Sequence, residues 1–178
     1  HCIYGKIKIQ TKNLKFKKFK IKKYKNYYLY KIENGRVFTD NVENVAIIKN
    51  NEILKNISFQ QIKGKLVNAK FNSVISNGTP NFLKKIEGNM LILAQGASGN
   101  NYCHWLLDIL PKLKLASLLY NLNKIVYLYF SKLNSFQLQI LKLIGIDKNK
   151  FIDTKKNKHC FSKKIIFTTH PNYFKGTF

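Results

Sequence analysis

Acidic residues and arginine are scarce in this sequence of 178 residues. Eight Asp and Glu stand against 32 Lys and Arg, so the formal net charge is +24, and Arg36 is the one arginine. Such a charge suits an anionic partner: nucleic acid, membrane lipid or sugar phosphate. Because nearly every cation is Lys, and Asn and Ile are also abundant, the bias favours an A+T-rich gene over one nucleic-acid surface. The favoured interpretation therefore includes no nucleic-acid partner. The alternative function is a basic nucleic-acid-binding module.

Cysteine is equally sparse and widely spaced, at Cys2, Cys103 and Cys160. No two of them form a C-x-x-C pair, which excludes the common zinc and redox motifs. An odd number of isolated thiols predicts reduced cysteines and a cytoplasmic protein. Cys103 and His104 are adjacent, and adjacent helical positions point about 100° apart. This excludes a nucleophile–base pair made of these two residues.

Long apolar runs are missing too, since none reaches the roughly 18 residues of a membrane span, and no secretory signal opens the chain. The hydrophobic fraction of 45% and the aromatic fraction of 13% exclude a disordered chain. Residues 1–26 interleave Lys with aromatic and aliphatic residues at irregular spacing. We interpret them as a poorly ordered lead-in that contacts an anionic membrane, which would place the protein peripherally on the inner face of the membrane.

Short apolar runs predict an antiparallel β region followed by an α/β core. The pair Asn34-Gly35 predicts a β-hairpin turn within residues 27–39, and more short strands follow to residue 60, interrupted at Asn50-Asn51. From 88 to 170, strands at 90–95, 125–130, 151–152 and 165–168 alternate with helices at 102–116 and 135–144, the latter capped by Ser135. This alternation predicts a parallel sheet and the α/β fold class.

The central feature is a strand, a loop of small residues and a helix, over residues 90–116. Asn100 or Asn101 can cap the helix, and Pro111 predicts a kink because it lacks the N–H that would bond the carbonyl of Leu107. In open α/β sheets such a junction faces the ligand crevice. His170 follows the last predicted strand and would lie on the same edge, although a His before Pro also fits an ordinary loop.

His104 and Asp108 are four residues apart and share one helix face, which Lys112 continues one turn further. This pattern fits a reactive pair, and it fits equally the solvated face of a surface helix. The preceding loop lacks the spacing of the G-x-S-x-G elbow, the P-loop and the dinucleotide-binding motif. Two ligands alone do not make a metal site, and no acid pair suits a glycosidase.

The segment 95–113, QGASGNNYCHWLLDILPKL, resembles the signature of glycosyltransferase family 61, N-Y/F-x-H-W-x-x-D-x-L-P-R/K-L. Asn34-Gly35-Arg36, Thr39-Asp40-Asn41 and Thr169-His170-Pro171 resemble the bacterial branch of that family. The resemblance therefore covers the chain from about Tyr28 onward. Cys103 stands where many members have an aromatic residue.

The resemblance implies one Rossmann-like half of a GT-B glycosyltransferase, preceded by a small antiparallel β region. Transfer would invert the anomeric centre with no metal or other cofactor, using a nucleotide-sugar donor as co-substrate and a glycan or surface polysaccharide as acceptor. Residues 27–178 would form the N-terminal, acceptor-side domain, with a hairpin region at 27–60 and an α/β core at 88–170. The C-terminal donor domain would be absent, and this piece alone would be inactive.

The same hypothesis assigns roles to residues. An inverting transfer needs a base for the acceptor hydroxyl, which could be His104 or Asp108; we prefer His104, with Asp108 as its partner. Trp105 would offer a stacking surface to a sugar, or would pack in the core. The helix N-terminus would face the sugar or diphosphate. The expected substrate-binding residues are Ser98, Gly99, Asn100, Asn101, Trp105 and His170.

Overall fold

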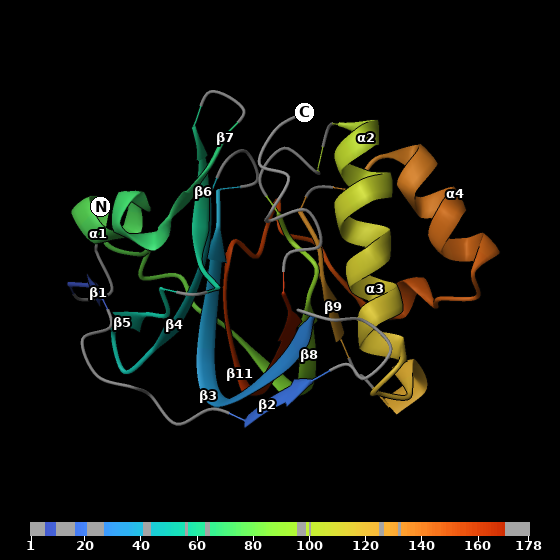
Figure 1. Ribbon diagram of the computed structural model, residues 1–178, viewed down its shortest axis with the longest axis horizontal. Coiled ribbons are helices and arrows are strands. Elements are labelled where there is room, and N and C mark those ends of the chain that lie inside the picture. Colours follow the sequence, from blue (N-terminus) through green and yellow to red (C-terminus); the bar gives the residue numbers. More distant parts are fainter. Residues whose placement is uncertain are drawn as a thin grey trace.

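The computed structural model is a mixed α/β protein with one large central sheet and few helices (Figure 1). It describes residues 6–9, 17–20, 27–40, 44–55, 57–62, 65–95, 99, 101–124, 127–131 and 133–169. The strands are β1 (Lys8–Ile9), β2 (Lys17–Lys20), β3 (Tyr28–Thr39), β4 (Asn44–Lys49), β5 (Glu52–Ile53), β6 (Phe59–Ile62), β7 (Lys65–Asn68), β8 (Lys84–Ile92), β9 (Tyr127–Tyr129), β10 (Phe151–Ile152) and β11 (His159–Thr168). The α-helices are α1 (Val74–Asn77), α2 (Tyr102–His104), α3 (Leu110–Ser117) and α4 (Ser135–Leu143).

The described strands form a single sheet in the order β1-β5-β4-β3-β11-β8-β9-β10, with β2 beside β3 and the β6–β7 hairpin beside β4. The pairs β11–β8, β8–β9 and β9–β10 are parallel, which confirms the parallel sheet predicted for the second half of the chain. The chain runs outward from β8 through β9 to β10, then returns to place β11 on the other side of β8. The strand order therefore reverses between β8 and β11, the position where open α/β sheets bind ligands at the carboxyl ends of their strands.

The predicted hairpin at Asn34-Gly35 is wrong, because β3 runs straight through both residues. Asn34 does adopt the left-handed conformation of a turn residue, with φ of 53°. However, β11 pairs antiparallel with β3 on both sides of it, with Gly35 opposite Ser162 and Glu33 opposite Lys164. Pairing with a strand more than 120 residues away in the sequence thus overrides the local turn preference.

A two-residue hairpin turn does occur at Asn50-Asn51, between β4 and β5. Both residues have positive φ, 52° and 59°, which is the pattern of the type I′ turn that matches the twist of paired strands. The predicted break between two antiparallel strands at this point is confirmed.

Four other predictions need correction. Part of the Lys-rich lead-in is ordered, because β1 pairs with β5 and β2 with β3. The strand expected at 90–95 begins at Lys84, and that expected at 165–168 begins at His159. Asn134, not Ser135, caps α4, and its backbone N–H donates to Gln137 Oε1 at 2.5 Å. Gly145 ends that helix with φ of 76°, as the sequence suggests.

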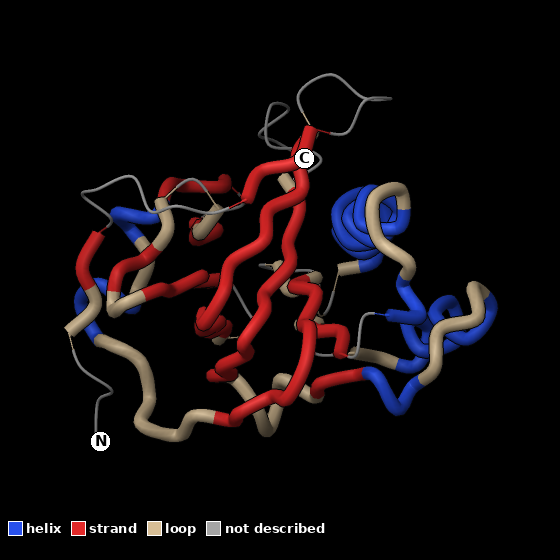
Figure 2. Tube along the Cα trace, turned by 90° about the horizontal axis from the view of Figure 1, so that it is seen from below, coloured by secondary structure: helices blue, strands red, loops and turns tan. Residues whose placement is uncertain are grey.

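The two faces of the sheet carry separate apolar cores, because successive strand residues point to opposite sides. Leu91 and Leu93 of the β8 region pack with Trp105, under the layer formed by α2, α3 and α4 (Figure 2). Met90 and Ile92 pack on the opposite face with residues of β3, β4 and β11. Within the described part of the chain, no helix is both long and apolar enough to cross a bilayer.

The one arginine is buried and ties three distant segments together. The Arg36 guanidinium donates to Asn51 Oδ1 at 2.5 Å and to Thr79 Oγ1 at 3.3 Å, and its Nη1 lies 3.1 Å from His159 Nε2. Because Arg can only donate, His159 Nε2 must accept, and His159 Nδ1–H then donates to the Pro80 carbonyl at 2.9 Å. The imidazole is therefore neutral. Burial is the main cause that lowers its pKa to about 4, and the nearby Arg36 charge adds to the effect.

Stability should depend on pH through His159. Its folded pKa of about 4 lies below the ordinary value of 6.5, so between these values the unfolded chain binds more protons. The free energy of unfolding should then fall by up to about 3 kcal/mol as pH drops from 6.5 to 4. Urea denaturation of the wild type and His159→Gln across this range measures the difference. An equal pH dependence in both proteins would contradict the assignment.

Gly35→Ala tests the close packing of β3 against β11. An added Cβ would lie 2.9 Å from Ile165 Cδ1 in a fully buried site. We expect the free energy of unfolding to fall by about 1–2 kcal/mol. Ile165→Val deletes the clashing Cδ1 atom, so in that background the Gly35→Ala penalty should shrink to less than about half. Full additivity of the two substitutions in chemical denaturation would show that this contact is not the cause.

Candidate functional site

The candidate site lies where β8 ends and the helical segment of α2, a π-turn and α3 begins. Asn101 caps this helix, its Oδ1 accepting the His104 N–H at 3.2 Å, as predicted for one of the two asparagines. The next turn, Trp105–Ile109, is a π-turn in which the Leu110 N–H bonds to the Trp105 carbonyl. It precedes Pro111, whose ring would collide with the carbonyl four residues back in a regular helix. A widened turn is a known way to relieve that conflict, and such turns are frequent at functional sites.

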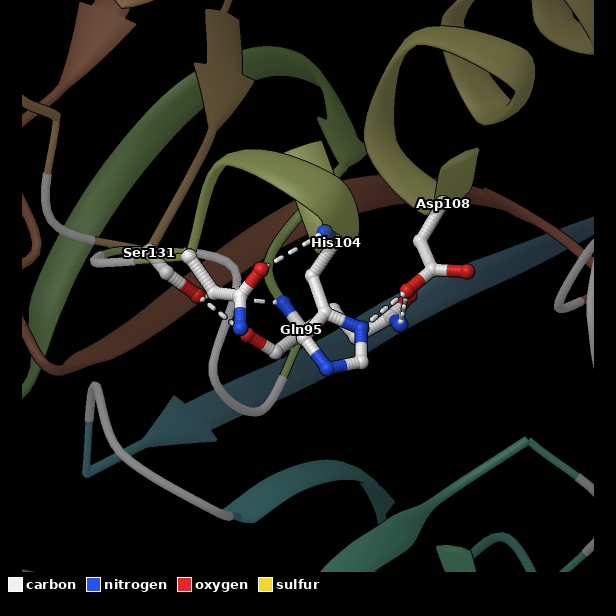
Figure 3. A network of polar contacts seen from close by, with 5 residues as sticks. Gln95, His104, Asp108 and Ser131 are labelled. Atoms are coloured by element: carbon white, nitrogen blue, oxygen red, sulfur yellow. Dashed lines mark hydrogen bonds and ion pairs between the residues drawn. The ribbon is translucent and has the colours of Figure 1, made fainter. Parts of the chain in front are cut away.

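Asp108 is the centre of a polar network that also contains His104 and Gln95 (Figure 3). Asp108 Oδ2 lies 2.7 Å from His104 Nδ1 and accepts a hydrogen bond of 2.6 Å from Gln95 Nε2. The Asp108 residue is only 2% exposed. A buried carboxylate needs such partners, because an unpaired one would cost several kcal/mol. The helix face that carries it is therefore not the solvated surface that the spacing alone also allowed.

The network sets the tautomer of His104. A carboxylate can only accept, so Nδ1 carries the proton that is shared with Asp108, and in the neutral ring Nε2 keeps its lone pair. No described residue hydrogen-bonds Nε2, and the side chain is 23% exposed. The arrangement can take a proton at Nε2 and stabilise the resulting imidazolium through Asp108.

Gln95 is held in place by the neighbouring strand. Its backbone N–H donates to Ser131 Oγ at 3.0 Å, and the Ser131 hydroxyl lies 2.8 Å from the Gln95 carbonyl. Ser131 follows β9 as Gln95 follows β8, so the carboxyl ends of two parallel strands clamp the residue that contacts Asp108. Neither residue was predicted as part of the site from the sequence. Their one signal was position, because Gln95 ends one predicted strand and Ser131 directly follows the next.

Lys112, one turn beyond Asp108, is also buried, with an exposed fraction of 5%. Burial lowers its pKa to about 8, and the attraction of Asp108 partly opposes this effect. No described side chain forms an ion pair or hydrogen bond with the ammonium. The ammonium does make a cation–π contact with the ring of Phe59, whose centroid lies 5.5 Å from Nζ.

The other expected site residues fall into two groups. Trp105 is 1% exposed and packs against Phe130, with ring centroids 5.7 Å apart, so its position supports core packing over sugar stacking. The Gly99 carbonyl accepts from Asn134 Nδ2 at 2.7 Å, and the Asn101 side chain serves as the helix cap. Ser98, Asn100 and His170 lie outside the described residues. Among the described residues, no three His, Cys, Asp or Glu side chains gather as a metal site would require.

Comparisons of this chain with models of known families, with curated proteins and with solved structures found no match. We therefore infer the function from the sequence motif and from the geometry of this site.

Replacing the buried Lys112 should stabilise the protein. The unpaired ammonium is desolvated, and Met has a similar length without the charge, so Lys112→Met should raise the free energy of unfolding by about 1–3 kcal/mol at pH 7. The folded pKa of about 8 lies below the ordinary 10.5, so the wild type gains stability between these values and the difference should shrink there. Denaturation at pH 7 and pH 10 measures it. The control is Lys114→Met, an exposed lysine on the same helix; a lower stability for Lys112→Met than for this control would contradict the prediction.

Proposed function

We propose that this chain is the acceptor-side part of an inverting glycosyltransferase related to family 61, with His104 as the general base. The contact between His104 Nδ1 and Asp108 Oδ2 carries the proposal. The motif resemblance singled out these two residues, and they meet near the carboxyl end of a parallel strand, with Asp108 on the π-turn and His104 directly before it. Neither spacing nor resemblance required Asp108 to be buried or to have a second partner.

In this mechanism the acceptor hydroxyl donates its proton to His104 Nε2. Its oxygen attacks the anomeric carbon of the donor sugar, and the bond from that carbon to the nucleoside diphosphate breaks on the opposite face. The base makes the hydroxyl oxygen more nucleophilic as the new bond forms, an effect worth about 10²–10⁴-fold in rate. Asp108 orients the ring and stabilises the imidazolium, as the carboxylate does in catalytic triads.

The geometry favours His104 over Asp108 as the base. Asp108 is buried, and its Oδ2 already contacts His104 and Gln95, so an acceptor hydroxyl has little access to it. His104 is partly exposed, and no described residue forms a hydrogen bond with its Nε2. Gln95 then acts as a positioning residue, because its amide fixes the carboxylate that orients the ring.

The test is turnover in an active protein that contains this chain, measured as nucleoside diphosphate released from sugar nucleotides in the presence of glycan acceptors. His104→Ala and Asp108→Asn should each lower turnover by about 10²-fold or more, since the first removes the base and the second disturbs its tautomer. Gln95→Leu should cost less, roughly 10-fold, since it only loosens Asp108.

The matched control is Cys103→Ser, which changes an exposed neighbour of His104 without touching the network. It should retain turnover within about 3-fold. Near-normal turnover in both His104→Ala and Asp108→Asn would remove the pair from the mechanism.

A further inference from the structure

A cavity of about 760 Å³ lies at the carboxyl ends of β8 and β11, where the strand order reverses. Ile92 and Ala94 line it from β8 and the residues after it, and Phe167 and Thr168 line it from β11. Residues of β3, β4 and the β6–β7 hairpin close it on the other side, and Lys112 enters from α3. The volume falls within the range of about 300–1,000 Å³ that small-molecule sites occupy.

One wall of the cavity is apolar and aromatic. Tyr30 and Phe167 stack with centroids 5.0 Å apart and ring planes within 5°, and Val45, Ile47 and Ile92 extend the surface. Such a wall favours an apolar body, because each buried square ångström of apolar surface contributes roughly 25 cal/mol.

Two polar side chains that line this cavity are buried and have no hydrogen-bond or ion-pair partner among the described residues, although the Phe59 ring centroid lies 5.5 Å from Lys112 Nζ. Lys112 is 5% exposed and its ammonium forms no described ion pair or hydrogen bond. Thr168 Oγ1 is buried with no hydrogen-bond partner in the described structure. Because buried polar groups are nearly always satisfied, the Lys112 ammonium is suited to a ligand that supplies a hydrogen-bond acceptor.

The charge of that occupant follows from the cations around the cavity. Lys55 and Lys70 line it together with Lys112, and no Asp or Glu is among its described lining residues. Asp108 attracts the Lys112 ammonium from one helical turn away without forming an ion pair. An anionic head at Lys112 would satisfy the ammonium through a charge-assisted hydrogen bond.

We propose that this cavity binds an anionic amphiphile: an apolar body that lies on the Tyr30–Phe167 wall, with a phosphate or carboxylate head paired to Lys112. The proposal does not depend on the glycosyltransferase function. The cavity adjoins the His104–Asp108 pair, since Ala94 precedes Gln95 and Lys112 follows Asp108 by one turn, but His104 itself does not line it.

The experiment is calorimetric titration of the whole chain at pH 7 with octyl phosphate, octanoate, octanol and inorganic phosphate. At least one of the two anionic amphiphiles should bind about 10-fold or more tightly than octanol and inorganic phosphate, because it alone supplies both the head and the apolar body. Whichever anionic probe binds more tightly identifies the head. Equal affinity for that probe and octanol, or no saturable binding of either anion, would overturn the proposal.

Variants separate this site from the general positive charge of the protein. Lys112→Met should lower affinity for the anionic probe by about 10-fold or more and leave octanol binding unchanged. Lys114→Met removes an equal but exposed charge from the same helix and should change neither. An equal loss in Lys112→Met and Lys114→Met would show a surface charge effect and would overturn the proposal. Circular dichroism verifies that each variant is folded.

Discussion

The burial of the Asp108 carboxylate is the constraint on which the site depends. A charge in the interior is tolerated only with partners, and those of Asp108 include the amide of Gln95 and the imidazole of His104. Each partner is positioned by a different part of the fold: Gln95 by Ser131 at the end of the adjacent strand, and His104 by the helix that Asn101 caps. The hydrogen bonds to this one carboxylate thus link the ends of β8 and β9 to the helix. They also fix the tautomer of the His104 ring.

The sheet joins two halves of different character, and their junction creates the cavity. On one side of β11 the strands are parallel and connected through helices; on the other, β3, β4 and their neighbours pair antiparallel. Because β11 pairs with both halves, it brings the residues that follow the parallel strand β8 close to Tyr30 and Val45 of the antiparallel half. Arg36 strengthens the antiparallel side by holding Asn51, Thr79 and His159 together, which needs the planar fork of a guanidinium in a chain whose other cations are lysines.

Local signals predicted elements well where nearby residues decide the backbone, and failed where distant residues do. The helix after the small-residue loop, the strand–helix alternation and the turn at Asn50-Asn51 follow from periodicity and from residues that tolerate positive φ. Asn34-Gly35 carries an equally strong turn signal, and Asn34 even adopts the matching φ, yet β3 continues because β11 pairs along its whole length. The early starts of β8 and β11 could not be predicted either, since their first residues become strand through long-range pairing, with each other and, for β11, also with β3.

The sequence alone determined that residues 104, 108 and 112 share one side of a helix, because that relation depends only on helical pitch. It did not determine whether that side meets water or the protein interior. That choice came from the tertiary structure, since Gln95, Phe59 and the ends of β8 and β11 surround the helix from positions far apart in the chain. Residues whose spacing also fits a solvated helix face are thereby a buried carboxylate bonded to Gln95 and His104 and a buried ammonium without a described ion pair, because burial depends on neighbours and spacing does not.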